Sequence, residues 1–132
     1  MASTMKALIY DRSSMDWDKS IGFEMREVPK PELDPVNRID DLDNVIIRVI
    51  YAGVCGSDRG IWYRKSFRDM IYDSLSSEGR DVRIIGHELL GEIVEVGTKA
   101  AREFGYRPGD IVSTESHIIC GVCYQCRVGD NH

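Results

Sequence analysis

The segment Ala52-Gly53-Val54-Cys55-Gly56-Ser57-Asp58 forms a Gly/Cys/Ser/Asp corner directly after Val45–Tyr51, the strongest β-strand signal in the chain. A second segment, Gly86-His87-Glu88-Leu89-Leu90-Gly91, leads into another expected strand, Leu89–Val96. A Gly-His-Glu triplet means little by itself. Here the triplet follows the cysteine segment and precedes Pro-Gly-Asp at 108–110 and a cysteine cluster, and it is this combination in this order that is informative.

Further strands surround these two segments. The patterns predict strands at Met5–Tyr10, Phe23–Val28, Val82–Ile85 and Ile111–Thr114, with a type II turn at Arg107–Asp110. Pro29, Pro31 and Pro35 interrupt regular structure, and Asp40–Asn44 is expected to form an acidic turn. Many short strands separated by turns indicate a barrel or sandwich rather than a doubly wound sheet.

One helix is expected, over Ser66–Leu75. Ser66 is a suitable N-cap, and Phe67, Ile71 and Leu75 recur every four residues. Ser76–Gly79 is predicted to end it.

Composition limits the class of protein. The 132 residues fit one domain, with 42% hydrophobic and 30% charged residues, as in an ordinary globular protein. The net charge is −5 with scattered acidic residues, so no nucleic-acid partner is expected. No apolar run is long enough to cross a bilayer and the first residues lack a signal-peptide pattern. We therefore expect no membrane partner and a cytoplasmic location.

The four cysteines favour metal binding over disulfides. Cys120, Cys123 and Cys126 lie within seven residues, a spacing that suits a metal in a reducing compartment. An iron–sulfur ferredoxin cluster begins with the same spacing but needs a cysteine where this chain has Asp130.

Together these motifs resemble the zinc-containing medium-chain alcohol and polyol dehydrogenases, including the sorbitol, threonine and glucose dehydrogenase branches. The resemblance runs from Met5-Lys6-Ala7 to the cysteine cluster. It implies a mostly β, GroES-like, partly open β-barrel with short helices over residues 1–132. A zinc lobe is expected from about residue 116, cut off at 132.

The resemblance also implies residue roles. Cys55 and His87 would bind a catalytic zinc, and Glu88 would either bind it or lie just outside. Ser57 would start a proton relay from the alcohol oxygen, and Asp58 would support the imidazole. Ser57, Asp58 and Glu88 are thus the candidate catalytic residues.

The lobe cysteines Cys120, Cys123 and Cys126 would bind a structural zinc whose fourth ligand is missing. In relatives a fourth cysteine follows, and here it would fall two positions after His132. His132 itself is one candidate for a borrowed ligand. His117 stands three residues before Cys120, as in threonine and polyol dehydrogenases, but its expected role is hydrogen bonding.

Two features depart from the family pattern. Many relatives end the relay with a histidine where this chain has Gly60. The 32 positions between Cys55 and His87 also form a long interval. The excess falls in Tyr63–Arg83, which is expected either to border the substrate cleft or to be peripheral.

The parent enzyme is therefore expected to oxidise a CH–OH group of an alcohol, polyol, sugar or amino alcohol with zinc and NAD or NADP, as a homo-oligomer. No Gly-x-Gly-x-x-Gly follows a strand, so this chain is predicted to lack the nucleotide-binding domain and to be inactive alone. The alternatives are a stand-alone GroES-like binding or chaperone module and a zinc-free quinone-reductase relative.

Overall fold

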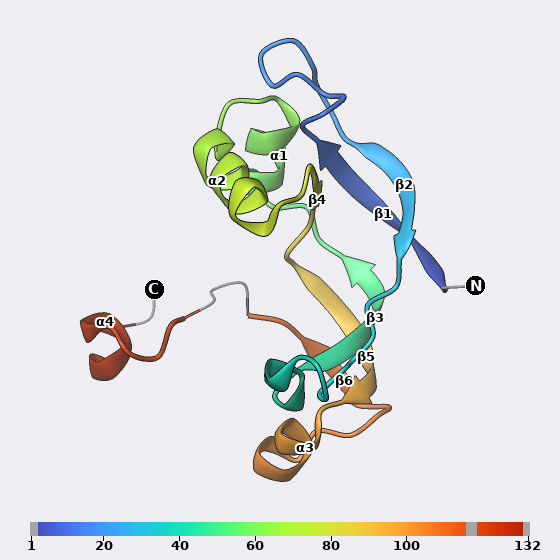
Figure 1. Cartoon of the computed structure of the whole chain (residues 1–132), viewed down its shortest axis with the longest axis vertical. Coiled ribbons are helices and arrows are strands. Elements are labelled where there is room, and N and C mark those ends of the chain that lie inside the picture. The colour runs from blue at the N-terminus through green and yellow to red at the C-terminus, as the bar shows by residue number, and fades with distance from the viewer. Residues whose placement is uncertain (1–2, 116–118, 131–132) are drawn as a thin grey trace.

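The computed structural model describes residues 3–115 and 119–130 and contains two three-stranded antiparallel sheets. The first has the order β2-β1-β4 and the second the order β3-β5-β6 (Figure 1). The strands are β1 Thr4–Asp11, β2 Glu24–Pro29, β3 Val45–Ala52, β4 Val82–Ile84, β5 Leu89–Val96 and β6 Ile111–Ser113. All six predicted strands are confirmed to within a residue or two at their ends.

The first sheet is held by β1, which pairs with both neighbours. Ile9 faces Glu24 on β2 and Ile84 on β4. Ala7, Ile9 and Tyr10 are buried while Lys6 and Leu8 are exposed, so most of β1 alternates as a half-buried strand does.

The second sheet is built on the long β3–β5 pair. Its register runs from Val45 opposite Val96 to Ala52 opposite Leu89, with irregularities at Ile46/Ile47 and between Val49 and Tyr51. β6 adds to the other edge of β5. The predicted turn before β6 is confirmed, since Gly109 has a φ of 97° and the Asp110 amide donates to the Arg107 carbonyl at 3.1 Å.

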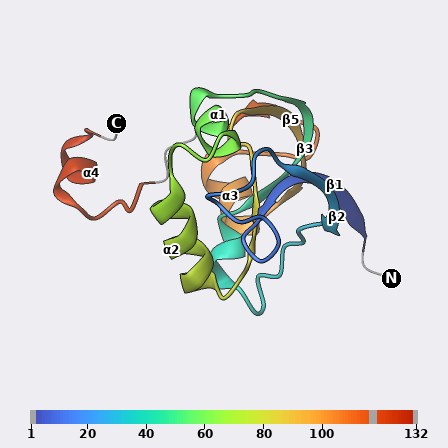
Figure 2. The ribbon, with the colours of Figure 1, turned by 90° about the horizontal axis from the view of Figure 1, so that it is seen from above.

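The helices are short. They are the 3-10 helix η1 Ile39–Leu42 and the α-helices α1 Gly56–Trp62, α2 Arg68–Glu78, α3 Thr98–Phe104 and α4 Tyr124–Val128. The expected acidic turn at 40–44 is thus partly 3-10 helix, and the corner at 53–58 already contains the first turn of α1. Figures 1 and 2 both place α4 away from the two sheets.

The predicted Ser66 N-cap is wrong. The Ser66 amide still donates to the Gly60 carbonyl at 3.3 Å, so at this residue the chain is leaving α1. The N-cap of α2 is Phe67, in the left-handed conformation with a φ of 70°. The helix also runs past the predicted end to Glu78 and is closed by Gly79, whose φ is 63°.

The main core lies between the first sheet, α1 and α2. It consists of the buried side chains of Tyr10, Trp17, Ile61, Ile71 and Leu75. Tyr10 and Trp17 meet edge to face with ring centroids 5.4 Å apart. Because Ile71 and Leu75 belong to Tyr63–Arg83, the segment that lengthens the Cys55–His87 interval is part of the core.

The chain is therefore mostly sheet with short helices, and the described strands do not close into a barrel, in agreement with the expected partly open β fold. Among residues 3–115 and 119–130, no helix has the length and apolar character needed to cross a membrane.

Candidate metal centre

The register of the second sheet builds one site from the two motifs. Ala52, the last residue of β3, pairs with Leu89, the first residue of β5. One step further, the Gly53 amide donates to the Glu88 carbonyl at 2.9 Å. The residues that leave β3 and those that enter β5 are consequently adjacent, which places Cys55 near His87 and Glu88.

Three potential metal donors meet at this point. One ligand atom each of Cys55, His87 and Glu88 lies within 4.8 Å of the others. Zinc binds sulfur at about 2.3 Å and nitrogen or oxygen at about 2.0–2.2 Å, so ligands of one tetrahedral ion lie about 3–4 Å apart. The cluster fits such an ion after small side-chain movements. Cys55 and His87 are half-buried and Glu88 is exposed, which leaves the site open on one side.

Asp58 connects the helix to the site. Its side chain is buried, and Oδ2 accepts a hydrogen bond from the Cys55 amide at 2.9 Å, which satisfies a free N–H at the start of α1. Oδ1 lies 3.5 Å from Nδ1 of His87. This pairing orients the ring so that Nε2 is the nitrogen left for a metal.

Ser57 lies near the other ring nitrogen of His87. Its Oγ is 3.4 Å from Nε2 of His87, so the hydroxyl borders the cluster. One turn further along α1, position 60 offers no side chain because it is glycine. The space over Gly60 is taken by Ser66, whose Oγ would lie 3.0 Å from a Cβ placed there. The sequence suggested Ser66 only as a helix N-cap, since its approach to Gly60 depends on the path of the loop between α1 and α2.

The electrostatics favour a thiolate at Cys55. Hydrogen bonds from the Ser57 amide and hydroxyl, and then from His87, hold the pKa of the Cys55 thiol below its ordinary value. The hydrogen bond with Cys55 and the Asp58 charge in turn raise the pKa of His87. The thiolate is the form that binds metal, whereas a protonated imidazole must first lose its proton.

The cysteine cluster forms a second group of donors. The sulfurs of Cys120, Cys123 and Cys126 all lie within 4.8 Å of one another, with Cys123 and Cys126 at 3.4 Å. Amide hydrogen bonds from Val122 and Cys123 lower the pKa of Cys120 to about 7. The two histidines considered near this lobe, His117 and His132, lie outside the described residues.

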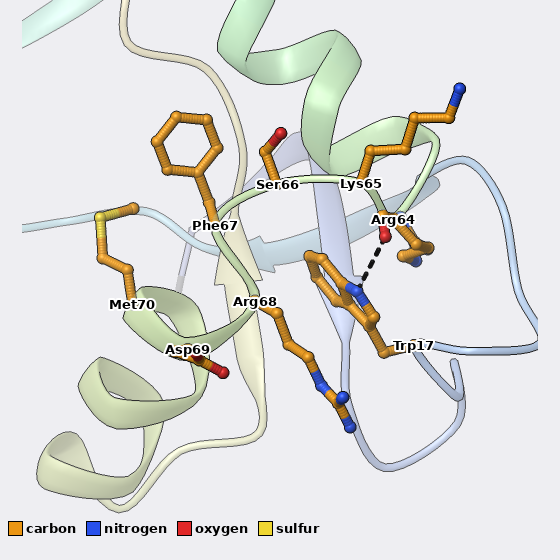
Figure 3. A pocket seen from close by; sticks show the side chains of 8 residues that line it. All are labelled: Trp17, Arg64, Lys65, Ser66, Phe67, Arg68, Asp69 and Met70. Atoms are coloured by element: carbon orange, nitrogen blue, oxygen red, sulfur yellow. Dashed lines mark hydrogen bonds between the residues drawn. The ribbon is translucent and has the colours of Figure 1, made fainter.

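A surface hollow of about 460 Å³ lies away from both clusters, where the loop after β1 meets the start of α2 (Figure 3). Trp17 forms part of its wall and donates from Nε1 to the Arg64 carbonyl at 3.0 Å. The side chains of Lys65 and Arg68 point in different directions and do not converge on a common centre. None of the candidate metal ligands lines this hollow.

The fold and the paired motifs define a GroES-like domain of the zinc dehydrogenase type. Residues 41–132 match the family described as the alcohol dehydrogenase GroES-like domain, and the chain belongs to this family.

Curated relatives extend the match over the whole chain. L-threonine 3-dehydrogenase of Rhizobium etli (strain CIAT 652) is 35% identical over 133 residues, covering 100% of this chain and 32% of the relative. The enzyme of the same name from Solibacter usitatus is 34% identical over 129 residues, covering 97% of this chain and 31% of the relative. The chain thus spans about a third of the length of these relatives.

Solved structures agree with the sequence matches. Alcohol dehydrogenase TADH from Thermus sp. ATN1 has a TM-score of 0.62 at 25% identity, over 96% of this chain and 29% of that one. A protein of Sinorhizobium meliloti 1021, described as a zinc-binding dehydrogenase and bound to NADP, has a TM-score of 0.61 at 27% identity, over 98% and 30%.

Proposed function

We propose that this chain is the metal-binding catalytic domain of a zinc-dependent, NAD(P)-linked dehydrogenase that acts on a CH–OH group. The convergence of the Cys55, His87 and Glu88 donor atoms within 4.8 Å carries the proposal. The threonine dehydrogenase relatives favour an alcohol bearing an amino group among the substrates considered, with polyols and sugars as the other candidates. The relatives and the donor cluster both favour this function over a zinc-free reductase or a stand-alone binding module.

Each residue of the site has a role in this proposal. Cys55 and His87 hold the zinc, and Glu88 supplies a third donor or a nearby charge. Zinc, when bound, polarises the oxygen of an alcohol or carbonyl and makes the alcohol easier to deprotonate. Ser57 would accept the alcohol proton at Oγ while its own hydroxyl proton passes on, and Asp58 would keep the His87 ring in place. Because Gly60 carries no side chain, the proton continues from Ser57 to water or to a group outside α1.

The cysteine lobe has a separate role. We propose that Cys120, Cys123 and Cys126 hold a structural zinc with a fourth donor from elsewhere. Structural zinc sites are closed by four ligands, whereas catalytic sites keep a position open. The two clusters therefore differ in the number of thiolates, three against one, which makes their metal spectra distinguishable.

Zinc and cobalt titrations of the purified chain test the proposal. We expect one component of metal binding that disappears in Cys55→Ser and in His87→Ala and persists when Cys120 is replaced by serine. Glu88→Gln weakens this component if the carboxylate is a donor. A chain that binds no metal through Cys55 contradicts the proposed function.

Cofactor binding provides a second test. Hydride transfer requires the nicotinamide to be held against the reacting carbon, and the glycine-rich turn that binds dinucleotides is not found in these 132 residues. We expect a titration of NADH fluorescence with this chain to show no saturable binding. Saturable binding of NADH in the micromolar range contradicts the proposal that this chain binds the metal and a separate part of the enzyme binds the cofactor.

A further inference from the structure

We infer that Gly53 is a positioning residue of the metal centre, because its missing side chain leaves the space in which the Glu88 carboxylate stands beside Cys55 and His87. This inference rests on the proposed function. A Cβ built on Gly53 would lie 2.6 Å from Oε2 of Glu88, 3.1 Å from its Cβ and 3.6 Å from its Cδ. Non-bonded carbon and oxygen atoms do not approach to 2.6 Å, so a side chain at position 53 and the present Glu88 rotamer exclude each other.

The strand pairing limits how far the backbone can separate to relieve this contact. The Gly53 amide is bonded to the Glu88 carbonyl at 2.9 Å, and the neighbouring pair Ala52 and Leu89 continues the β3–β5 ladder. The Glu88 carboxylate is the flexible end of its side chain and is exposed. A shift of a few tenths of an ångström relieves the 3.1 Å approach to the Glu88 Cβ with the sheet still paired. The 2.6 Å approach to Oε2 instead requires the carboxylate to leave its present position beside Cys55 and His87.

Position 53 requires glycine because a side chain would not fit there beside the present Glu88 carboxylate, and not because of its backbone conformation. Gly53 is not among the residues with positive φ, so its backbone conformation is open to any residue. Gly56 is a matched control on the other side of Cys55. It also lacks a positive φ, and a Cβ built there meets nothing within 4 Å. The two glycines flank the same ligand but differ in whether a methyl group would displace a metal donor.

The experiment measures the affinity of the full chain for zinc and cobalt. The quantity compared between variants is the affinity of the binding component that Cys55→Ser abolishes. We expect Gly53→Ala to weaken this component by about 10- to 100-fold, as for other residues that hold a metal ligand in place. Gly56→Ala should leave it unchanged. In a Glu88→Ala background, Gly53→Ala should cause no further loss, because the group it displaces is already gone.

Three results overturn the inference: a Gly53→Ala chain with the parental affinity, a Gly56→Ala chain that loses as much, or an undiminished effect of Gly53→Ala when Glu88 is already alanine. If Gly53→Ala prevents folding, Glu88→Ala should restore it, and failure to restore it also overturns the inference. If the unmodified chain shows no metal binding that depends on Cys55, this result would instead contradict the proposed function itself.

Discussion

Asp58 performs two tasks, and replacing it with alanine or with asparagine separates them. One carboxylate oxygen accepts from the Cys55 amide at the start of α1, and the other faces Nδ1 of His87. Alanine removes both contacts. Asparagine has nearly the same shape and keeps an oxygen that can accept from the Cys55 amide, but it loses the negative charge that holds the imidazole.

The two contacts predict different magnitudes. Loss of the hydrogen bond at the helix start costs about 1–2 kcal/mol of stability. The cost arises because the Cys55 amide loses the Asp58 carboxylate that caps it. Loss of the partner of a ligating histidine costs about 10- to 100-fold in metal affinity. We therefore expect Asp58→Ala to lower both the free energy of unfolding and the metal affinity. Asp58→Asn should lower the metal affinity and leave the free energy of unfolding nearly unchanged.

Urea unfolding of the metal-free chain measures the first quantity, and competition with a zinc chelator measures the second. Asp43→Asn is the control, because it removes the same charge from an exposed pair with Lys99 and should change stability by less than about 1 kcal/mol. The reasoning is refuted if the Asp58→Asn chain binds zinc as tightly as the parental chain, or if Asp58→Ala leaves stability unchanged.

Three further predictions concern other parts of the chain. Hydrogen bonds from Ser13 and Arg26 lower the pKa of Asp11 to about 2, so Asp11 stabilises the fold above its unfolded pKa of about 4. Asp11→Asn should cost about 1–2 kcal/mol at pH 7, a difference that shrinks in urea unfolding as the pH falls from 4 to 2. Leu75→Ala should cost about 2–5 kcal/mol in the same measurement because Leu75 is fully buried, whereas Leu8→Ala at a 42% exposed position should cost less. Cys120→Ser should remove the thiolate-rich component of the cobalt spectrum and leave the Cys55-dependent component intact.

The sequence predicted the strands better than the helices. β-branched runs and alternation marked β3 and β5, and both lie where the pattern placed them. α1 was missed because two of its seven residues are glycines, which lower intrinsic helix propensity. It forms because Asp58 caps its first turn and Ile61 is buried in the core, and neither contact is visible in a local pattern.

The candidate site was proposed from motifs and not from geometry, and the roles of its residues stay predictions. The motifs suggested Cys55 and His87 as partners, but no spacing rule brings together two residues 32 positions apart. Likewise, the sequence did not indicate that Gly53 lies against Glu88 or that Ser66 covers Gly60. These close approaches depend on how strands and loops pack.

The strand register also explains why the long interval between Cys55 and His87 leaves the candidate donors together. Cys55 comes three residues after the end of β3, and His87 comes two before the start of β5. Because β3 and β5 are hydrogen-bonded neighbours with Ala52 opposite Leu89, these two distances along the chain determine the approach of the donors. The segment between Cys55 and His87 can lengthen without moving these donors, provided that the chain returns to the start of β5 beside the end of β3. Here it does so by packing Ile71 and Leu75 of α2 into the core, so these residues contribute to the packing of the domain while the sheet positions the candidate metal donors.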